Sequence, residues 1–120
     1  MKKIPLAFAS VALLASAASA ALPESVDLLV VGGGASGVTA GVQAARMGTN
    51  TLIIEEQPWL GGMLTSAGVT ATDGNYNMQG GLWGEFLRNL ADQYGGFEAL
   101  HTGWVSRVLF EPHVGERVFR

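Results

Sequence analysis

The stretch from Asp27 to Glu56 constrains the fold more than any other part of the chain. An apolar run at 28–31 breaks off at three consecutive glycines. A segment compatible with a helix then covers 35–47, and a second apolar run follows at 51–54. A strand, a glycine turn, a helix and a second strand within about 30 residues are typical of one βαβ unit. The sequence therefore predicts an α/β fold built on a parallel pair of strands.

The glycines of this stretch follow the pattern G-x-G-x-x-G, with Gly32, Gly34 and Gly37 at the three fixed positions. The first glycine permits a sharp turn. The second lets the main chain approach a pyrophosphate, and the third lets the helix pack closely on the strand. A helix beginning at Ala35 and Ser36 would direct its free N–H groups and its dipole at the phosphates, and the Ser36 hydroxyl could bond a phosphate oxygen. We call residues 32–37 the phosphate turn; the alternative is a glycine-rich turn with a purely structural role.

Two acidic residues follow the second apolar run. Glu55 lies 23 positions after Gly32, and Glu56 comes next. A carboxylate at the end of this strand can accept hydrogen bonds from both hydroxyls of an adenosine ribose, and it would repel a 2′-phosphate. Both acids are therefore predicted to bind the cofactor. The first motif alone fits either FAD or NAD.

A second glycine pair narrows this choice. Gly61 and Gly62 lie six and seven residues after Glu55, a spacing that resembles the FAD-binding signature of flavoproteins with two dinucleotide domains. The segment WLGGMLTSAGV at 59–69 resembles the family of FAD-dependent oxidoreductases, distant relatives of the flavoprotein subunits of fumarate reductase. The stretches GGLWGEFL at 80–87 and FEPHVGERVF at 110–119 are also similar to the N-terminal region of that family.

This resemblance covers most of the chain after Asp27, and it implies a Rossmann-type FAD-binding domain. It also implies that Gly61, Gly62 and Met63 lie along the approach to the cofactor. The reaction would transfer a hydride between a small-molecule substrate and the flavin, with no catalytic residue assigned in this chain. Relatives of fumarate reductase can carry flavin covalently on a histidine soon after the second glycine pair. No histidine lies between Gly62 and Gly81, so FAD is expected to bind non-covalently.

The first 20 residues have the pattern of a secretory signal peptide. Lys2 and Lys3 precede an apolar stretch of 15 residues at 4–18, and Ala18-Ser19-Ala20 forms an A-x-A cleavage site. The apolar stretch is shorter than the ~20 residues that a membrane-spanning helix needs. The pattern predicts cleavage after Ala20, a periplasmic or secreted product, and no stable membrane anchor after cleavage. The alternative is a retained anchor.

Composition excludes several classes of function. Lys2 and Lys3 are the only lysines, so cleavage would leave five basic and ten acidic residues, a formal net charge of 5 − 10 = −5. This charge argues against nucleic acid and anionic membrane surfaces as partners. The chain has no cysteine, which excludes disulfides, thiolate metal sites and dithiol chemistry. Loss of both lysines would exclude Schiff-base chemistry from the mature chain.

The remaining elements are predicted from turn residues and periodicity. The polar, glycine-rich segment 61–81 predicts a loop with a short strand at 69–72, which would either pass the pyrophosphate toward the flavin or merely connect two elements. Apolar residues at helical spacing predict a helix at 82–94 with a buried apolar face. A strand is predicted at 104–110, and a helix at 113–120 is predicted after Pro112.

Two further expectations concern metal binding and completeness. Four residues could be considered as metal ligands, but their spacing fits no known metal site and favours exposed polar positions. They are Asp73, His101, Glu111 and His113. Two parallel strands give too little sheet to bury both faces, so 21–120 is expected to be the truncated N-terminal part of an FAD-binding domain, inactive alone. A catalytically inactive secreted fragment is the alternative.

Overall fold

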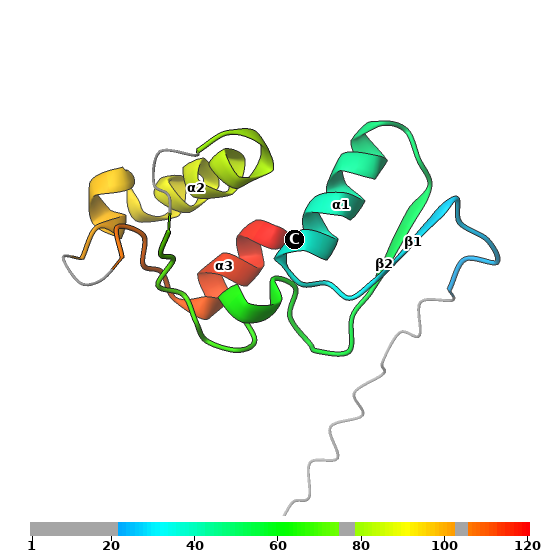
Figure 1. Cartoon of the computed structure of the whole chain (residues 1–120), viewed down its shortest axis with the longest axis horizontal. Coiled ribbons are helices and arrows are strands. Elements are labelled where there is room, and N and C mark those ends of the chain that lie inside the picture. The colour runs from blue at the N-terminus through cyan, green and yellow to red at the C-terminus, as the bar shows by residue number, and fades with distance from the viewer. Residues whose placement is uncertain (1–21, 75–78, 103–105) are drawn as a thin grey trace, which may run out of the picture.

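The computed structural model describes residues 22–74, 79–102 and 106–120, so the predicted signal peptide at 1–20 lies outside the described residues. Figure 1 shows a βαβ unit on one side and a group of helices on the other. The order along the chain is β1 (Leu28–Val31), α1 (Ala35–Arg46), β2 (Thr51–Ile54), the 3-10 helix η1 (Gly62–Leu64), α2 (Gly81–Tyr94), the 3-10 helix η2 (Phe97–Leu100) and α3 (Pro112–Phe119).

The structure confirms the predicted βαβ unit. β1 and β2 have the predicted bounds and pair in parallel, with Leu28 opposite Thr51 and Val31 opposite Ile54. α1 connects the two strands and ends at Arg46, one residue before the predicted end. The fold class is therefore α/β, with an incomplete Rossmann-type parallel sheet.

Small residues bring α1 close to the strands. A Cβ added to Gly37 would lie 1.9 Å from the carbonyl oxygen of Gly32. A Cβ added to Gly41 would lie 2.5 Å from Cδ1 of Ile53 on β2. These contacts confirm that α1 packs closely on the strands, and Gly37 and Gly41 make this approach possible.

The opposite face of the sheet is open. Leu29 and Val31 on β1 are 50% and 77% exposed, and Ile54 on β2 is 40% exposed. Strand side chains alternate between the two faces, so the residues between them, such as Val30, point toward α1. Parallel sheets usually bury both faces. Within the described residues, this sheet buries one.

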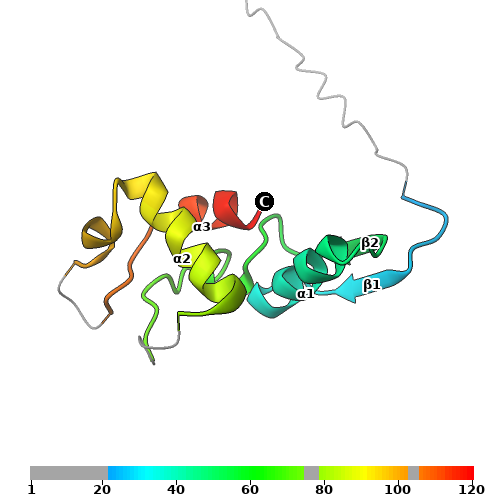
Figure 2. The same ribbon diagram turned by 90° about the horizontal axis from the view of Figure 1, so that it is seen from above.

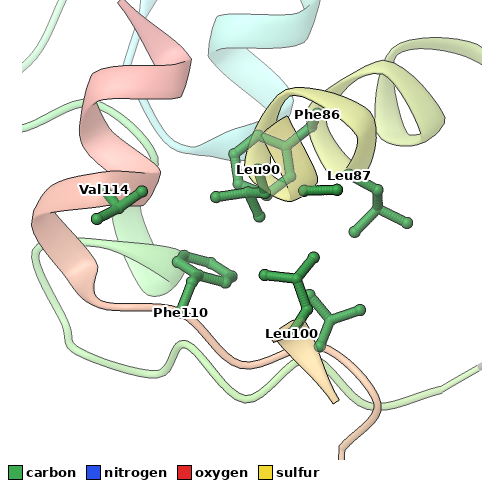
Figure 3. Close-up of a cluster of buried hydrophobic side chains, with 8 residues drawn as sticks. Phe86, Leu87, Leu90, Leu100, Phe110 and Val114 are labelled. Carbon is green, nitrogen blue, oxygen red and sulfur yellow. The ribbon is translucent and has the colours of Figure 1, made fainter. Parts of the chain in front are cut away.

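A hydrophobic cluster joins α2, η2 and α3. The ring of Phe86 lies near its centre, stacked 4.5 Å from the ring of Phe119 and edge-on 5.7 Å from that of Phe110. The predicted buried face of α2 is therefore confirmed. The buried members of the cluster, six of which are labelled in Figure 3, are Phe86, Leu87, Leu90, Ala91, Leu100, Val108, Phe110 and Val114.

α3 connects this cluster to the βαβ unit. It begins at Pro112, which occupies the first turn as predicted, and its C-terminal end lies beside the loop that carries Gly61 (Figure 2). A Cβ added to Gly61 would lie 2.6 Å from the ring of Phe119.

Across 22–74, 79–102 and 106–120, the helices are too short or too polar to cross a membrane.

Two predicted strands are wrong in the described residues. Segments 69–72 and 106–110 form no strand; one antiparallel bridge joins Thr72 to Val108, and the Ser106 hydroxyl donates to the carbonyl of Thr72. The Oγ of Ser106 accepts the N–H of Val108 at 3.0 Å, so a side chain takes the hydrogen bond that a strand ladder would use. Residues 104–105 of the second predicted strand lie outside the described residues.

Candidate cofactor-binding site

The phosphate turn joins β1 to the N-terminus of α1. Gly32 has φ +100°, a left-handed conformation that favours glycine, and its N–H donates to the carbonyl oxygen of Ile54 at 2.8 Å. Gly34 is the N-cap of α1, and its carbonyl accepts the N–H of Val38 at 2.9 Å. Because Gly34 has no side chain to cap the helix, the first N–H groups of α1 are available to an anion.

The three motif glycines meet different surroundings. The backbone conformation requires glycine at Gly32, and the carbonyl of Gly32 requires it at Gly37. Gly34 has φ −62° and ψ 174°, which any residue can adopt, and no atom lies within 4 Å of an added Cβ. The fold therefore explains the first and third glycines of the motif but not the second.

The second glycine pair lies directly on the phosphate turn. Gly61 forms a parallel bridge with Gly34, and its N–H donates to the carbonyl oxygen of Gly33 at 2.8 Å. A Cβ added to Gly62 would lie 3.1 Å from the Cα of Gly34. Gly61 and Gly62 both have positive φ, +106° and +56°. Two motifs distant in sequence thus pack backbone against backbone; Gly33 and Gly61 are buried in this contact, and Gly34 and Gly62 are partly exposed.

Glu55 is held by two backbone N–H groups. The N–H of Gly33 donates to Oε2, and that of Gln57 donates to Oε1 at 2.8 Å. The hydrogen bonds from Gln57 and then Gly33 lower the pKa of Glu55 below its usual value, because they stabilise the ionised form. A carboxylate offers about four lone-pair positions, so it can still accept bonds from a ligand. Glu55 lines a surface cavity of about 440 Å³ together with Val31, Gly32, Ile54 and Glu56.

The other predicted site residues lie at the start of α1, after β2 or on η1. Ala35 and Ser36 begin α1, and Ser36 is exposed. Glu56 is exposed beside Glu55, and Met63 on η1 is 64% exposed. Their contact with a cofactor stays a prediction. Sequence reasoning missed Gly33, whose only signal was its place between two motif glycines.

Metal binding finds no support beside this site. In the part of the chain that the structure describes, no three or more His, Asp or Glu side chains are grouped so as to hold a metal ion. The residues considered as ligands are all exposed, as predicted; they are Asp73, His101, Glu111 and His113.

The fold and the two glycine motifs define a dinucleotide-binding βαβ unit. The sequence model of the family described as FAD dependent oxidoreductase matches residues 27–120. The chain therefore belongs to the family of FAD-dependent oxidoreductases, which confirms the resemblance of its motifs. Membership in this family implies a flavin cofactor.

A curated relative shares part of the chain. NADH:fumarate oxidoreductase of Klebsiella pneumoniae (strain 342) is 38% identical over 64 residues, which are 52% of this chain and 7% of the relative. The chain thus spans a small part of the length of that relative. None of the solved structures matches the chain significantly.

Proposed function

We propose that residues 21–120 form the N-terminal part of a domain that binds FAD non-covalently in an oxidoreductase. The phosphate turn binds the pyrophosphate, and Glu55 binds the adenosine ribose with Glu56 beside it. Gly61, Gly62 and Met63 form the approach to the flavin ring. The bound flavin supplies hydride transfer with a small-molecule substrate, while the residues of this chain bind and orient it.

The main support is the position of Gly34. Its backbone conformation does not require glycine, and the space around an added Cβ is open. A pyrophosphate on the N-terminus of α1 would occupy that space, so a ligand accounts for a glycine that the fold does not explain. The bridge from Gly34 to Gly61 brings the second glycine pair to the same place, with Gly61 buried and Gly62 partly exposed.

Two observations favour FAD over NAD as the dinucleotide. The chain belongs to a family described by its dependence on FAD. The second glycine pair, which the first motif alone does not demand, packs on the phosphate turn through the N–H of Gly61. The alternative is an NAD-binding module. If that alternative held, excess NAD would displace bound FAD from the protein.

Replacement of Gly34 by valine tests the proposal, and the chain offers a matched control at Gly80. Gly80 is also a helix N-cap, with φ −88° and ψ 173°, and no atom lies within 4 Å of an added Cβ. The Gly34→Val protein should lose its flavin absorbance after purification, whereas Gly80→Val should keep it. Unchanged flavin content in Gly34→Val would refute the assignment of the turn.

We also propose export by the general secretory route, with cleavage after Ala20. The support is Lys2 and Lys3 before the apolar stretch at 4–18, and the A-x-A site that follows it. N-terminal sequencing of the exported product should begin at Ala21. Recovery of the chain from the membrane fraction with Met1 in place would show an anchor instead.

A further inference from the structure

Three parts of the candidate site meet at Gly33. Its N–H donates to Oε2 of Glu55, and its carbonyl accepts the N–H of Gly61 at 2.8 Å. A Cβ added to Gly33 would lie 2.6 Å from Cδ2 of Leu60, the residue before the second glycine pair. The residue is buried, so these contacts leave no space for a side chain.

We propose that Gly33 is a positioning residue that holds the Glu55 carboxylate in place for the hydroxyls of the adenosine ribose. Gly33 acts through Glu55 and need not touch the cofactor itself. The inference rests on the proposed function, because it assumes that FAD is the ligand and that Glu55 faces its ribose.

The geometry explains how such positioning would work. Glu55 is partly exposed, and a free glutamate side chain would sample several rotamers at a cost in affinity when a ligand orders it. Donors from Gly33 and Gln57 bind different carboxylate oxygens, so together they fix the plane of the group. The remaining lone pairs are then held in one direction before the ligand arrives.

A methyl group on Gly33 should disturb this arrangement directly. Its Cβ would lie 3.0 Å from the Cβ of Glu55 and 3.1 Å from Oε2, so the carboxylate must move. Gly33 is not one of the glycines with positive φ, and alanine would therefore add no backbone strain of that kind. The effect of Gly33→Ala should arise from the displaced side chains of Glu55 and Leu60.

The test compares FAD with an analogue that lacks the 2′-hydroxyl of the adenosine ribose. In the wild-type protein, stripped of flavin, the analogue should bind about tenfold more weakly, as expected for one hydrogen bond to a charged group. In Gly33→Ala, the ratio of the Kd of the analogue to the Kd of FAD should fall from about ten to close to one. If the role of Gly33 were purely structural, Gly33→Ala would weaken the binding of FAD and of the analogue equally, and the ratio of their Kd values would stay near ten. That result would overturn the proposal.

Further variants separate positioning from misfolding. Gly80→Ala should keep the wild-type ratio. If Gly33→Ala does not fold, the comparison is made between Leu60→Ala and Gly33→Ala/Leu60→Ala, because removal of the Leu60 side chain relieves its clash and leaves the contact with Glu55. Glu55→Ala should also abolish the preference for the hydroxyl, and Gly33→Ala should change the ratio no further in that background.

The outcomes for the two proposals differ. A wild-type protein that binds neither ligand would refute the proposed FAD function. A wild-type protein that binds FAD and the analogue equally well would leave that function standing and overturn the proposed roles of Glu55 and Gly33.

Discussion

The glycines of the phosphate turn would respond differently to the same methyl group. At Gly37, it would lie 1.9 Å from a backbone carbonyl, which cannot move without shifting the turn. At Gly34, it would meet open space. The sequence predicted these positions because the motif spacing encodes them. The contact of Gly33 with Glu55 could not be predicted, because it depends on how β2 places a side chain against the turn.

Gly37→Ala should therefore destabilise the protein by about 1–3 kcal/mol or more, the usual cost of overpacking, although alanine is the better helix former. Gly34→Ala should cost less than about 1 kcal/mol, because only the N-cap preference changes. Urea unfolding of the flavin-free proteins measures both values. Equal destabilisation by the two substitutions would contradict the packing described for α1.

At the scale of elements, glycines and proline set most boundaries. Gly80 and Gly95 flank α2, and Pro112 begins α3, so the sequence predicted both helices to within one residue. The largely apolar run 104–110 suggested a strand, but Val108 and Phe110 are buried in the helical cluster while the backbone of this segment makes one bridge, from Val108 to Thr72. Periodicity reports which side chains are buried, and it does not report which backbone groups find a partner.

The buried face of α2 should contribute far more stability than its exposed ion pair. Leu90 is fully buried, and Leu90→Ala should cost about 2–5 kcal/mol. Glu85 pairs with Arg46 of α1 at 2.6 Å, but the two side chains are 36% and 50% exposed. Glu85→Gln should therefore change stability by less than about 1 kcal/mol. Urea unfolding of both variants measures the two changes in the free energy of unfolding. A larger change for Glu85→Gln than for Leu90→Ala would show that the ion pair, and not the buried face, stabilises α2.

For the molecule as a whole, α3 links the hydrophobic cluster around Phe86 to the βαβ unit. The ring of Phe119 packs on both Phe86 of α2 and the loop at Gly61. The outer face of the sheet nevertheless stays open, with Val31 77% exposed. Sequence reasoning foresaw this imbalance, because two apolar strands were predicted with no further sheet partners. It could not foresee that α3 would reach the second glycine pair.

The polypeptide Ala21–Arg120 on its own should consequently show no cooperative thermal transition in near-UV circular dichroism. Conformational entropy opposes folding by on the order of 100 kcal/mol for a chain of this size, and the uncovered sheet face forgoes part of the compensating burial. Added FAD could contribute about 2.7 kcal/mol at a hundredfold excess over Kd. A cooperative transition that moves upward with FAD would contradict this prediction.

We propose that the protein holds FAD without a covalent bond, and release of the bound molecule by acid followed by its identification tests this proposal. The full-length protein is purified and precipitated with acid, and the supernatant is analysed by chromatography for FAD, FMN and NAD. We predict FAD in the supernatant, at about one per chain if the phosphate turn at 32–37 holds one dinucleotide. A protein that carries NAD, or no dinucleotide even after incubation with FAD, would contradict it.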